Sequence, residues 1–270
     1  MTRVGGVPAK KSLGQNFLVD DGVAGRIIDA ADVGPTDTVV EIGPGHGVLT
    51  RGLAGRAGRV IAIELDPMLY DKLKSEFSGV PNLELVLGDA LKYPYEGLDK
   101  GVKVVANLPY YISTPIITRL IAARGKINLM VLMLQKEVAA RITAPPGGKD
   151  YGYLSVMVQL YTEPKVLFDV SRHAFKPEPK VDSAILKLQM RTEPAVAVAD
   201  YALFEKIVSA AFSQRRKTLR NTMKASGLFT DEGTAGLAGS GIDPTRRAET
   251  FTVAEFGLLT DFLFEFRKSK

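Results

Sequence analysis

Apolar and polar positions alternate along the chain in blocks of strand and helix length. Five short apolar runs, rich in Val, Ile and Leu, have the length of buried strands and lie at residues 38–42, 59–63, 83–87, 102–106 and 128–133. Between them, segments 48–57, 67–77 and 115–123 are expected to be helices, two of which carry proline at the start, where a helix tolerates it. This order predicts an α/β fold with a doubly wound parallel sheet, which binds ligands at the carboxyl ends of its strands.

The pattern changes in the last third of the chain. Two further strand-like runs, 164–171 and 183–190, are expected to pair antiparallel at the sheet edge. The sequence Thr192-Glu193-Pro194 then breaks the pattern, and the segments that follow read as helices, at 201–212, 215–225 and 253–266. We therefore expect two domains, a sheet domain over 1–194 and a small helical domain over 195–270.

Composition narrows the chemistry. The chain of 270 residues is 46% hydrophobic and 24% charged, which is typical of a globular protein. It has no cysteine and two histidines, which excludes disulfides, thiolate zinc sites and cysteine nucleophiles, and no metal site is expected. We expect a cytoplasmic protein without membrane contact, because no apolar run has the roughly 18 residues of a membrane span and the first twenty residues lack an apolar signal core. The net charge of +5 is compatible with a polyanionic partner.

The first candidate ligand site follows the first strand. Segment 41–47 reads EIGPGHG, and glycines such as Gly43 and Gly45 allow a tight turn and the close approach of a ligand to the backbone. The spacing departs from the G-x-G-x-x-G pattern of dinucleotide sites. A glycine-rich turn without a ligand would also explain it.

Acidic residues end the next two strands. Glu64 follows the glycine segment by about twenty residues, where a carboxylate can accept hydrogen bonds from both hydroxyls of a ribose. Asp89 follows the third strand, where it can accept from an adenine amino group or can cap a helix. An acid after the second strand is equally compatible with an NAD-dependent dehydrogenase, so the fourth strand has to separate these functions.

The fourth strand ends in Asn107-Leu108-Pro109-Tyr110. An adenine amine is a poor nucleophile because its lone pair is delocalised into the ring. Acceptance of its hydrogens by the side-chain oxygen of Asn107 and the carbonyl of Leu108 makes the nitrogen more tetrahedral and stabilises its developing positive charge. Pro109 fixes the turn, and Tyr110 offers a ring for stacking, worth roughly 1–3 kcal/mol. Read alone, the tetrapeptide is also a common turn sequence.

Together these features resemble the class I S-adenosylmethionine-dependent methyltransferases over about the first 190 residues. The tetrapeptide is similar to the N-P-P-Y type motif of enzymes that methylate exocyclic base nitrogens. Segments 11–18 (KSLGQNFL), 173–183 (HAFKPEPKVDS) and 211–219 (AFSQRRKTL) extend the resemblance, over nearly the whole chain, to the ribosomal RNA adenine dimethyltransferases.

The resemblance implies a Rossmann-like methyltransferase sheet with a small C-terminal helical domain, and S-adenosylmethionine as the cofactor. It implies a cofactor site formed by Asn16, Leu18, Gly43, Gly45, Glu64, Asp89 and Asn107. It further implies a catalytic group formed by Asn107, Leu108, Pro109, Tyr110 and Phe175, with Phe175 in the wall of the base pocket. From the sequence alone, Phe175 could also be a core aromatic residue.

The match is closest to the small-subunit members of the family. These dimethylate two adjacent adenosines in a hairpin near the 3′ end of the RNA. The expected partner is therefore small-subunit ribosomal RNA, in a pre-ribosomal particle, bound by a monomer that also has a role in ribosome biogenesis. A resistance-type methyltransferase of large-subunit RNA and a mainly non-catalytic assembly factor remain as alternatives.

Basic residues gather at the start of one predicted C-terminal helix. Arg215, Arg216, Lys217 and Arg220 repel one another unless a partner such as an RNA phosphate backbone neutralises them. We expect them to bind RNA. The alternative is an ordinary solvated face.

Overall fold

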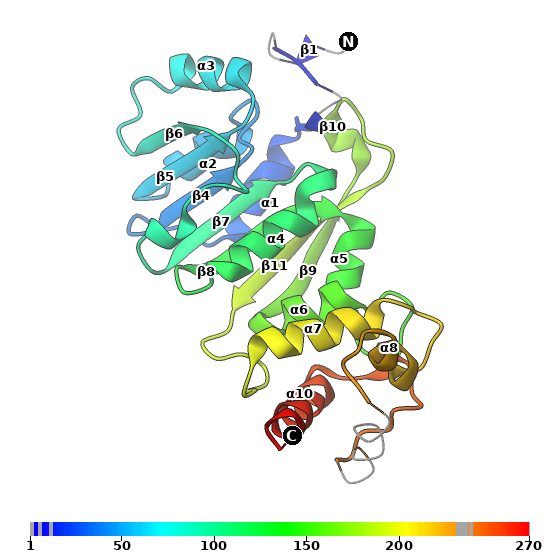
Figure 1. Cartoon of the computed structure of the whole chain (residues 1–270). Coiled ribbons are helices and arrows are strands. Elements are labelled where there is room, and N and C mark those ends of the chain that lie inside the picture. Colours follow the sequence, from blue (N-terminus) through cyan, green and yellow to red (C-terminus); the bar gives the residue numbers. More distant parts are fainter. Residues whose placement is uncertain (1–2, 5–6, 11–12, 231–236, 238–239, 270) are drawn as a thin grey trace. The chain divides into compact units, whose positions relative to one another are not determined.

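The computed structural model describes residues 3–4, 7–10, 13–230, 237 and 240–269 (Figure 1). By their contacts, residues fall into two compact units, Met1–Ala139 with Glu163–Met190, and Ala140–Thr162 with Arg191–Lys270. The second unit therefore includes a segment that lies inside the predicted 1–194 domain. These units describe packing, so two domains stay a prediction: 1–194, with the expected cofactor-binding and catalytic residues, and 195–270, with the expected RNA-binding residues.

The first unit is built on a seven-stranded sheet with the order β6-β5-β4-β7-β8-β11-β9. Its strands are β4 (Thr38–Ile42), β5 (Arg59–Glu64), β6 (Leu83–Leu87), β7 (Val102–Asn107), β8 (Ile127–Gln135), β9 (Thr162–Val170) and β11 (Ser183–Met190). Strands β6, β5, β4, β7 and β8 are parallel, and β11 runs antiparallel to β8. This confirms the predicted methyltransferase-type α/β sheet, and the chain order reverses between β4 and β7, where such sheets bind ligands.

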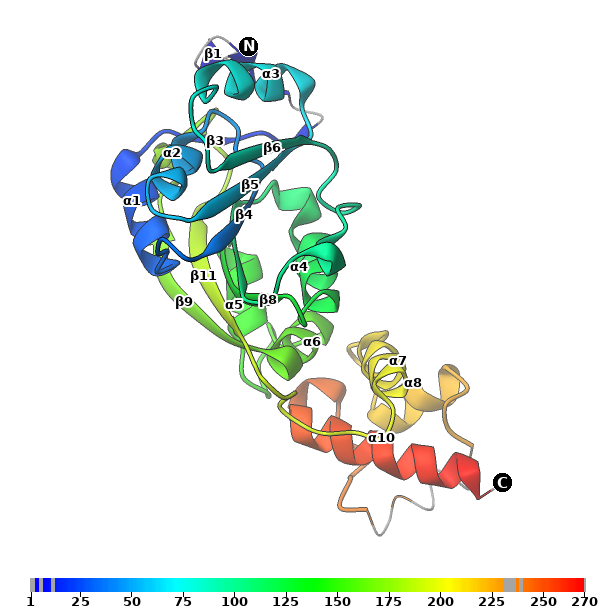
Figure 2. The ribbon, with the colours of Figure 1, turned by 90° about the vertical axis from the view of Figure 1, so that its left-hand side faces the viewer.

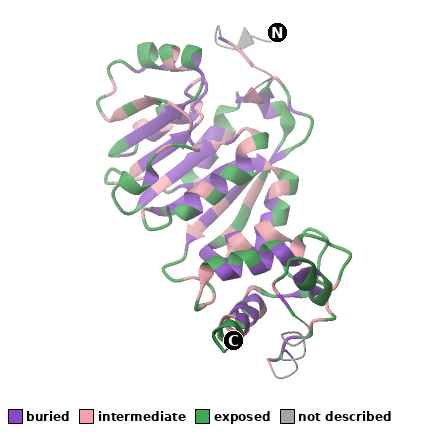
Figure 3. Cartoon of the chain, viewed as in Figure 1, coloured by how far each residue is buried: buried purple, intermediate pink, exposed green. Residues whose placement is uncertain are grey.

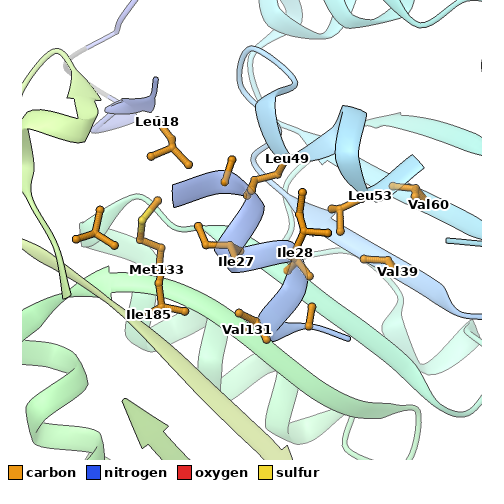
Figure 4. Packing of buried hydrophobic residues seen from close by; sticks show 14 of the residues in the cluster. Leu18, Ile27, Ile28, Val39, Leu49, Leu53, Val60, Val131, Met133 and Ile185 are labelled. Carbon is orange, nitrogen blue, oxygen red and sulfur yellow. The ribbon is translucent and has the colours of Figure 1, made fainter. Parts of the chain in front are cut away.

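Helices cover both faces of this sheet, with α1 and α2 on one side and α4 on the other (Figure 2). The helices of the first unit are α1 (Asp21–Ala30), α2 (Val48–Ala54), α3 (Pro67–Glu76) and α4 (Ser113–Ala122), and α5 (Lys136–Thr143) crosses into the second unit. Alternate β8 residues such as Leu129 and Val131 pack with α1 and α2 in one core cluster (Figure 4). Their sequence neighbours Met130 and Leu132, which point to the other face, are also buried, so β8 is covered on both faces (Figure 3).

Two pairs of short strands lie outside the seven-stranded sheet. Near the N-terminus lie β1 (Arg3–Val4), β2 (Val7–Pro8) and β3 (Phe17–Leu18), and β10 (Phe175–Lys176) follows β9. Strand β3 pairs antiparallel with β10, with Leu18 opposite Phe175. Two segments about 157 positions apart in the sequence thus become neighbours.

The second unit is helical, with α6 (Tyr153–Tyr161), α7 (Tyr201–Phe212), α8 (Leu219–Ala225) and α10 (Val253–Lys268). Three rings, of Phe204, Phe212 and Phe251, surround Phe256, and the centroid of each lies within 6.5 Å of the Phe256 ring centroid. The predicted helix 215–225 is wrong at its start. Helix α8 begins only at Leu219, because Thr218 caps it by accepting a hydrogen bond from the Asn221 N–H.

In the described part of the chain, no helix is long and apolar enough to cross a membrane.

Candidate active site

A pocket opens at the carboxyl ends of β4, β5, β6 and β7. Ten of the predicted site residues line it: Asn16, Gly43, Gly45, Glu64, Asp89, Asn107, Leu108, Pro109, Tyr110 and Phe175. The remaining wall is largely apolar and includes Phe17, Ile42, Ile63, Leu65, Leu69, Ala90, Tyr111 and Ile112. The fold therefore brings together residues that are spread over some 160 positions of the sequence.

The glycine segment and Glu64 form one hydrogen-bonded unit. Gly45 has a positive φ of 59°, and a Cβ added to it would lie 3.0 Å from the Phe17 ring, so this position favours glycine. Its N–H donates to Glu64 Oε2 at 3.1 Å, and the Asp66 N–H donates to Glu64 Oε1 at 2.8 Å. Burial raises the pKa of Glu64 despite these bonds. A carboxylate has about four acceptor sites, so the two bonds leave acceptor capacity towards the pocket.

Asp89 lies in a turn rather than at the start of a helix. Its Oδ1 accepts from the Leu91 N–H at 2.9 Å, and its carbonyl accepts from the Lys92 N–H. The residue lines the pocket beside Ala90. Helix capping, the alternative left open by the sequence, does not apply here, since no helix follows directly after β6.

Asn107 ends β7 with its amide oriented by the N-terminal segment. The side-chain nitrogen donates to the backbone carbonyl of Asn16 at 3.1 Å, which leaves Oδ1 as the atom able to accept from a ligand. Leu108 is buried, and its N–H donates to the Met133 carbonyl at 3.3 Å. Strand β8 therefore holds the backbone from which the Leu108 carbonyl projects.

The remainder of this segment is braced from two sides. The Tyr110 hydroxyl shares a 2.9 Å hydrogen bond with Ser183 Oγ at the start of β11, and partial burial raises its pKa. The Pro109 carbonyl accepts from the Ile112 N–H at 3.1 Å and from Ser113 Oγ at 3.3 Å. The turn after β7 is thus fixed before α4 begins.

Asp66 attaches the N-terminal wall of the pocket, residues 13–17, to the end of β5. No role for Asp66 was predicted from the sequence. Lys10 Nζ lies 2.7 Å from Asp66 Oδ1, and Gln15 Nε2 donates to Oδ2 at 3.3 Å. Burial alone would raise the pKa of Asp66, but the hydrogen bonds from Lys10, the Met68 N–H and Gln15 lower it. Residues 11 and 12 of the 11–18 motif lie outside the described residues.

Phe175 and Leu18 are paired between β10 and β3, but only Phe175 lines the pocket. Phe175 is 2% exposed and lines the pocket, while it also belongs to the core cluster. Phe175 therefore lies both in the core and on the pocket wall, and its role beside a target base stays a prediction. Leu18 is not among the lining residues, because its side chain packs into the core (Figure 4).

A second buried carboxyl group belongs to Glu41, two residues before Gly43 in the chain. Glu41 in β4 is 1% exposed, and its Oε2 has no hydrogen-bond partner among the described residues. Burial, with a smaller contribution from the charge of Glu64, raises the pKa of Glu41 to about 8. Glu41 does not line the pocket.

The predicted RNA-binding residues all lie in the second unit and are exposed. Arg215, Arg216 and Lys217 precede α8, and Arg220 is in its first turn. The Arg215 guanidinium donates to the Lys149 carbonyl, within the same unit. The described structure thus leaves this cationic cluster accessible to solvent.

Comparison with known proteins identifies the family. A family model described as ribosomal RNA adenine dimethylase matches residues 6–264. The chain belongs to this family. Enzymes of the ribosomal RNA adenine dimethylase family are S-adenosylmethionine-dependent methyltransferases, which excludes the dehydrogenase alternative.

Relatives and solved structures agree with this membership. Ribosomal RNA small subunit methyltransferase A of Moorella thermoacetica is 50% identical over 271 residues, covering 96% of this chain and 94% of its own. The protein of the same name from Pelotomaculum thermopropionicum is 47% identical over 270 residues, with coverages of 95% and 92%. A dimethyladenosine transferase from Plasmodium falciparum superposes with a TM-score of 0.81 at 30% identity, covering 93% and 98% of the two chains. The 23S rRNA methyltransferase ErmE gives 0.71 at 31% identity, covering 92% and 100%.

Proposed function

We propose that this protein transfers methyl groups from S-adenosylmethionine to the exocyclic amines of two adjacent adenosines in a hairpin near the 3′ end of small-subunit ribosomal RNA. The observation that carries the proposal is one pocket lined by Glu64, Asp89 and the Asn107–Tyr110 segment. The preference for the small subunit rests on the 44–50% identity to relatives named for that subunit, against 31% to ErmE.

The pocket suits the cofactor in shape and in chemistry. The left-handed glycines Gly43 and Gly45 leave a surface without side chains, while Glu64 and Asp89 supply carboxylates at successive strand ends. In the proposed site, Glu64 accepts from the ribose hydroxyls and Asp89 accepts from the adenine amino group. Asn16 closes the site from the N-terminal segment. Leu18 would contribute only by supporting that segment from the core.

S-adenosylmethionine supplies an electrophilic methyl group when it is bound. Asn107 Oδ1 and the Leu108 carbonyl accept hydrogen bonds from the target amine, and its developing positive charge meets two oriented dipoles. The amine attacks with its own lone pair while it still carries both hydrogens, so no strong base is needed before attack, and the surplus proton leaves the methylated nitrogen for solvent afterwards. Asn16 keeps the Asn107 amide in the accepting orientation through the 3.1 Å hydrogen bond.

The ring of Tyr110 and the buried Phe175 wall the space for the adenine. Stacking on such a ring offsets part of the cost of extruding the base. After the first transfer the amine has one hydrogen left, so one acceptor contact is lost and the added methyl needs room. The second transfer therefore depends more strongly on the ring walls than the first.

We assign RNA contact outside the pocket to Arg215, Arg216, Lys217 and Arg220 in the 195–270 region. Their exposure and like charge support this assignment. The same proposal places the protein in the cytoplasm as a monomer acting on a pre-ribosomal particle, with a role in assembly of the small subunit.

The test is to incubate the protein with labelled S-adenosylmethionine and with unmethylated small or large ribosomal subunits, and then to map the modified bases. We expect two adjacent dimethylated adenosines in small-subunit RNA. Labelling of large-subunit RNA alone, or of no RNA, contradicts the proposal. Asn107→Ala is the matched control: it should abolish transfer while binding of the small subunit persists, which separates the catalytic role from an assembly role.

A further inference from the structure

Tyr111 is an exposed aromatic ring on the wall of the pocket. Its side chain lines the pocket and is 56% exposed. The other aromatic residues of the described lining are less available, since Phe17 and Phe175 are buried and Tyr110 is half-buried with its hydroxyl bonded to Ser183. Tyr111 therefore offers the ring surface that a ligand outside the pocket can reach.

The position of Tyr111 is fixed although its ring is exposed. It lies in the middle of a 3₁₀ turn, Tyr110–Ile112, which the Ile112 N–H closes on the Pro109 carbonyl. Gly14 has a φ of 57°, and a Cβ added to it would lie 3.1 Å from Tyr111 Cδ1. The backbone of the N-terminal wall thus approaches the ring closely. A ring that is already ordered loses little conformational entropy when it stacks on a ligand.

A base flipped into the pocket leaves its neighbour with an unstacked face. We propose that Tyr111 stacks on the nucleotide adjacent to the target adenosine, and that it holds this base outside the pocket while its neighbour is methylated. This inference rests on the proposed function, because it takes single-stranded or opened RNA as the substrate.

A structural role would give Tyr111 a different effect. If the ring served only to support Gly14 and the N-terminal wall, its removal would weaken S-adenosylmethionine binding, because that wall includes Asn16 and Phe17. If it stacks on RNA, its removal weakens RNA binding and leaves cofactor affinity intact. The affinities for RNA and for S-adenosylmethionine therefore distinguish the two roles.

The experiment compares Tyr111→Ala and Tyr111→Phe with the wild type. Tyr70→Ala on α3 is the control, since Tyr70 is a partly exposed tyrosine that does not line the pocket. We measure kcat and KM for unmethylated small subunits, and calorimetric affinity for S-adenosylmethionine. We also follow the fluorescence of a hairpin RNA in which 2-aminopurine replaces the adenosine next to the target.

We expect Tyr111→Ala to raise KM for RNA about 5- to 150-fold, equivalent to ~1–3 kcal/mol of stacking, and to abolish the stacking-induced quenching of 2-aminopurine. Tyr111→Phe keeps the ring and should behave like the wild type, as should Tyr70→Ala. An unchanged KM with unchanged quenching in Tyr111→Ala overturns the inference, and so does a loss confined to cofactor affinity. A wild type that methylates no small-subunit RNA overturns the proposed function and this inference with it.

Discussion

Replacement of Glu64 by glutamine alters a side chain whose two carboxylate oxygens both accept hydrogen bonds from backbone N–H groups. Oε2 accepts from the Gly45 N–H at 3.1 Å and Oε1 from the Asp66 N–H at 2.8 Å. In Glu64→Gln, one of these oxygens becomes an NH2 group that faces a backbone donor. The variant therefore loses one charge-assisted hydrogen bond and leaves a buried N–H without an acceptor.

Both losses can be given a magnitude. A hydrogen bond to a charged group contributes about 1.5–3 kcal/mol, and an unsatisfied buried donor costs about 1–3 kcal/mol. We therefore expect Glu64→Gln to unfold at a lower temperature. The proposed ribose contact predicts in addition that affinity for S-adenosylmethionine falls about 10- to 150-fold, which corresponds to the loss of one charge-assisted bond.

The pH dependence provides a second readout. Because burial raises the pKa of Glu64 above its ordinary value of 4.5, wild-type affinity should decline on acidification at a higher pH than an exposed glutamate would produce. The ionised form is the better acceptor, so affinity is complete above the raised pKa and is lost below it. Glutamine does not titrate, and this part of the pH profile should be flat in the variant.

The assay is calorimetric titration with S-adenosylmethionine between pH 5 and 8, together with thermal unfolding without ligand. Glu84→Gln on β6 is the matched control, because Glu84 is half exposed and pairs with Arg59 at 2.6 Å. It should leave cofactor affinity unchanged and cost at most about 1 kcal/mol of stability. A Glu64→Gln protein that binds the cofactor within twofold of the wild type would refute the ribose contact.

Substitutions at three further positions test other parts of the structure. Tyr110→Phe removes the 2.9 Å hydrogen bond to Ser183 but keeps the ring, so single-turnover methylation should fall less than tenfold, whereas Tyr110→Ala should raise KM for RNA about 5- to 150-fold. Gly45→Ala places a Cβ 3.0 Å from the Phe17 ring at a φ of 59°, and calorimetry should show at least about tenfold weaker cofactor binding. Glu41, whose pKa burial raises to about 8, keeps a proton that the unfolded chain releases above about pH 4.5, so stability falls as pH rises between these values. Glu41→Gln should therefore reduce the loss of melting temperature between pH 5 and 8. A melting temperature that falls as steeply with pH in the variant as in the wild type would contradict the raised pKa of Glu41.

The parallel sheet and the residues at its strand ends could be predicted from the sequence because their signals are local. A buried parallel strand is a continuous apolar run, and the residue that follows it lies at the ligand-binding edge. Glu64 and Asn107 each follow such a run, whereas Asp89 follows the partly exposed edge strand β6, whose apolar run is interrupted by Glu84; all three residues line the pocket. The positions of the strands in the sequence were therefore sufficient to predict that these three residues share one site.

Other parts depend on contacts that leave no local pattern. The pairing of Leu18 with Phe175 joins two-residue strands, which are too short to produce any periodicity. The attachment of Lys10 to Asp66 is a single ion pair over 56 positions. Segment 140–162 belongs to the helical unit through the packing of α6 against α7 and α10, although the chain continues from it directly into β9.

The β3–β10 pair also links the two halves of the pocket thermodynamically. Asn16 and Phe17 wall the part next to the glycine segment, and the same short ribbon carries Phe175 on its other strand. We predict that a ligand which restrains one strand of this pair also restrains the other, so that the second ligand loses less conformational entropy on binding. Cofactor and adenosine should each bind more tightly in the presence of the other, by the same factor in both directions.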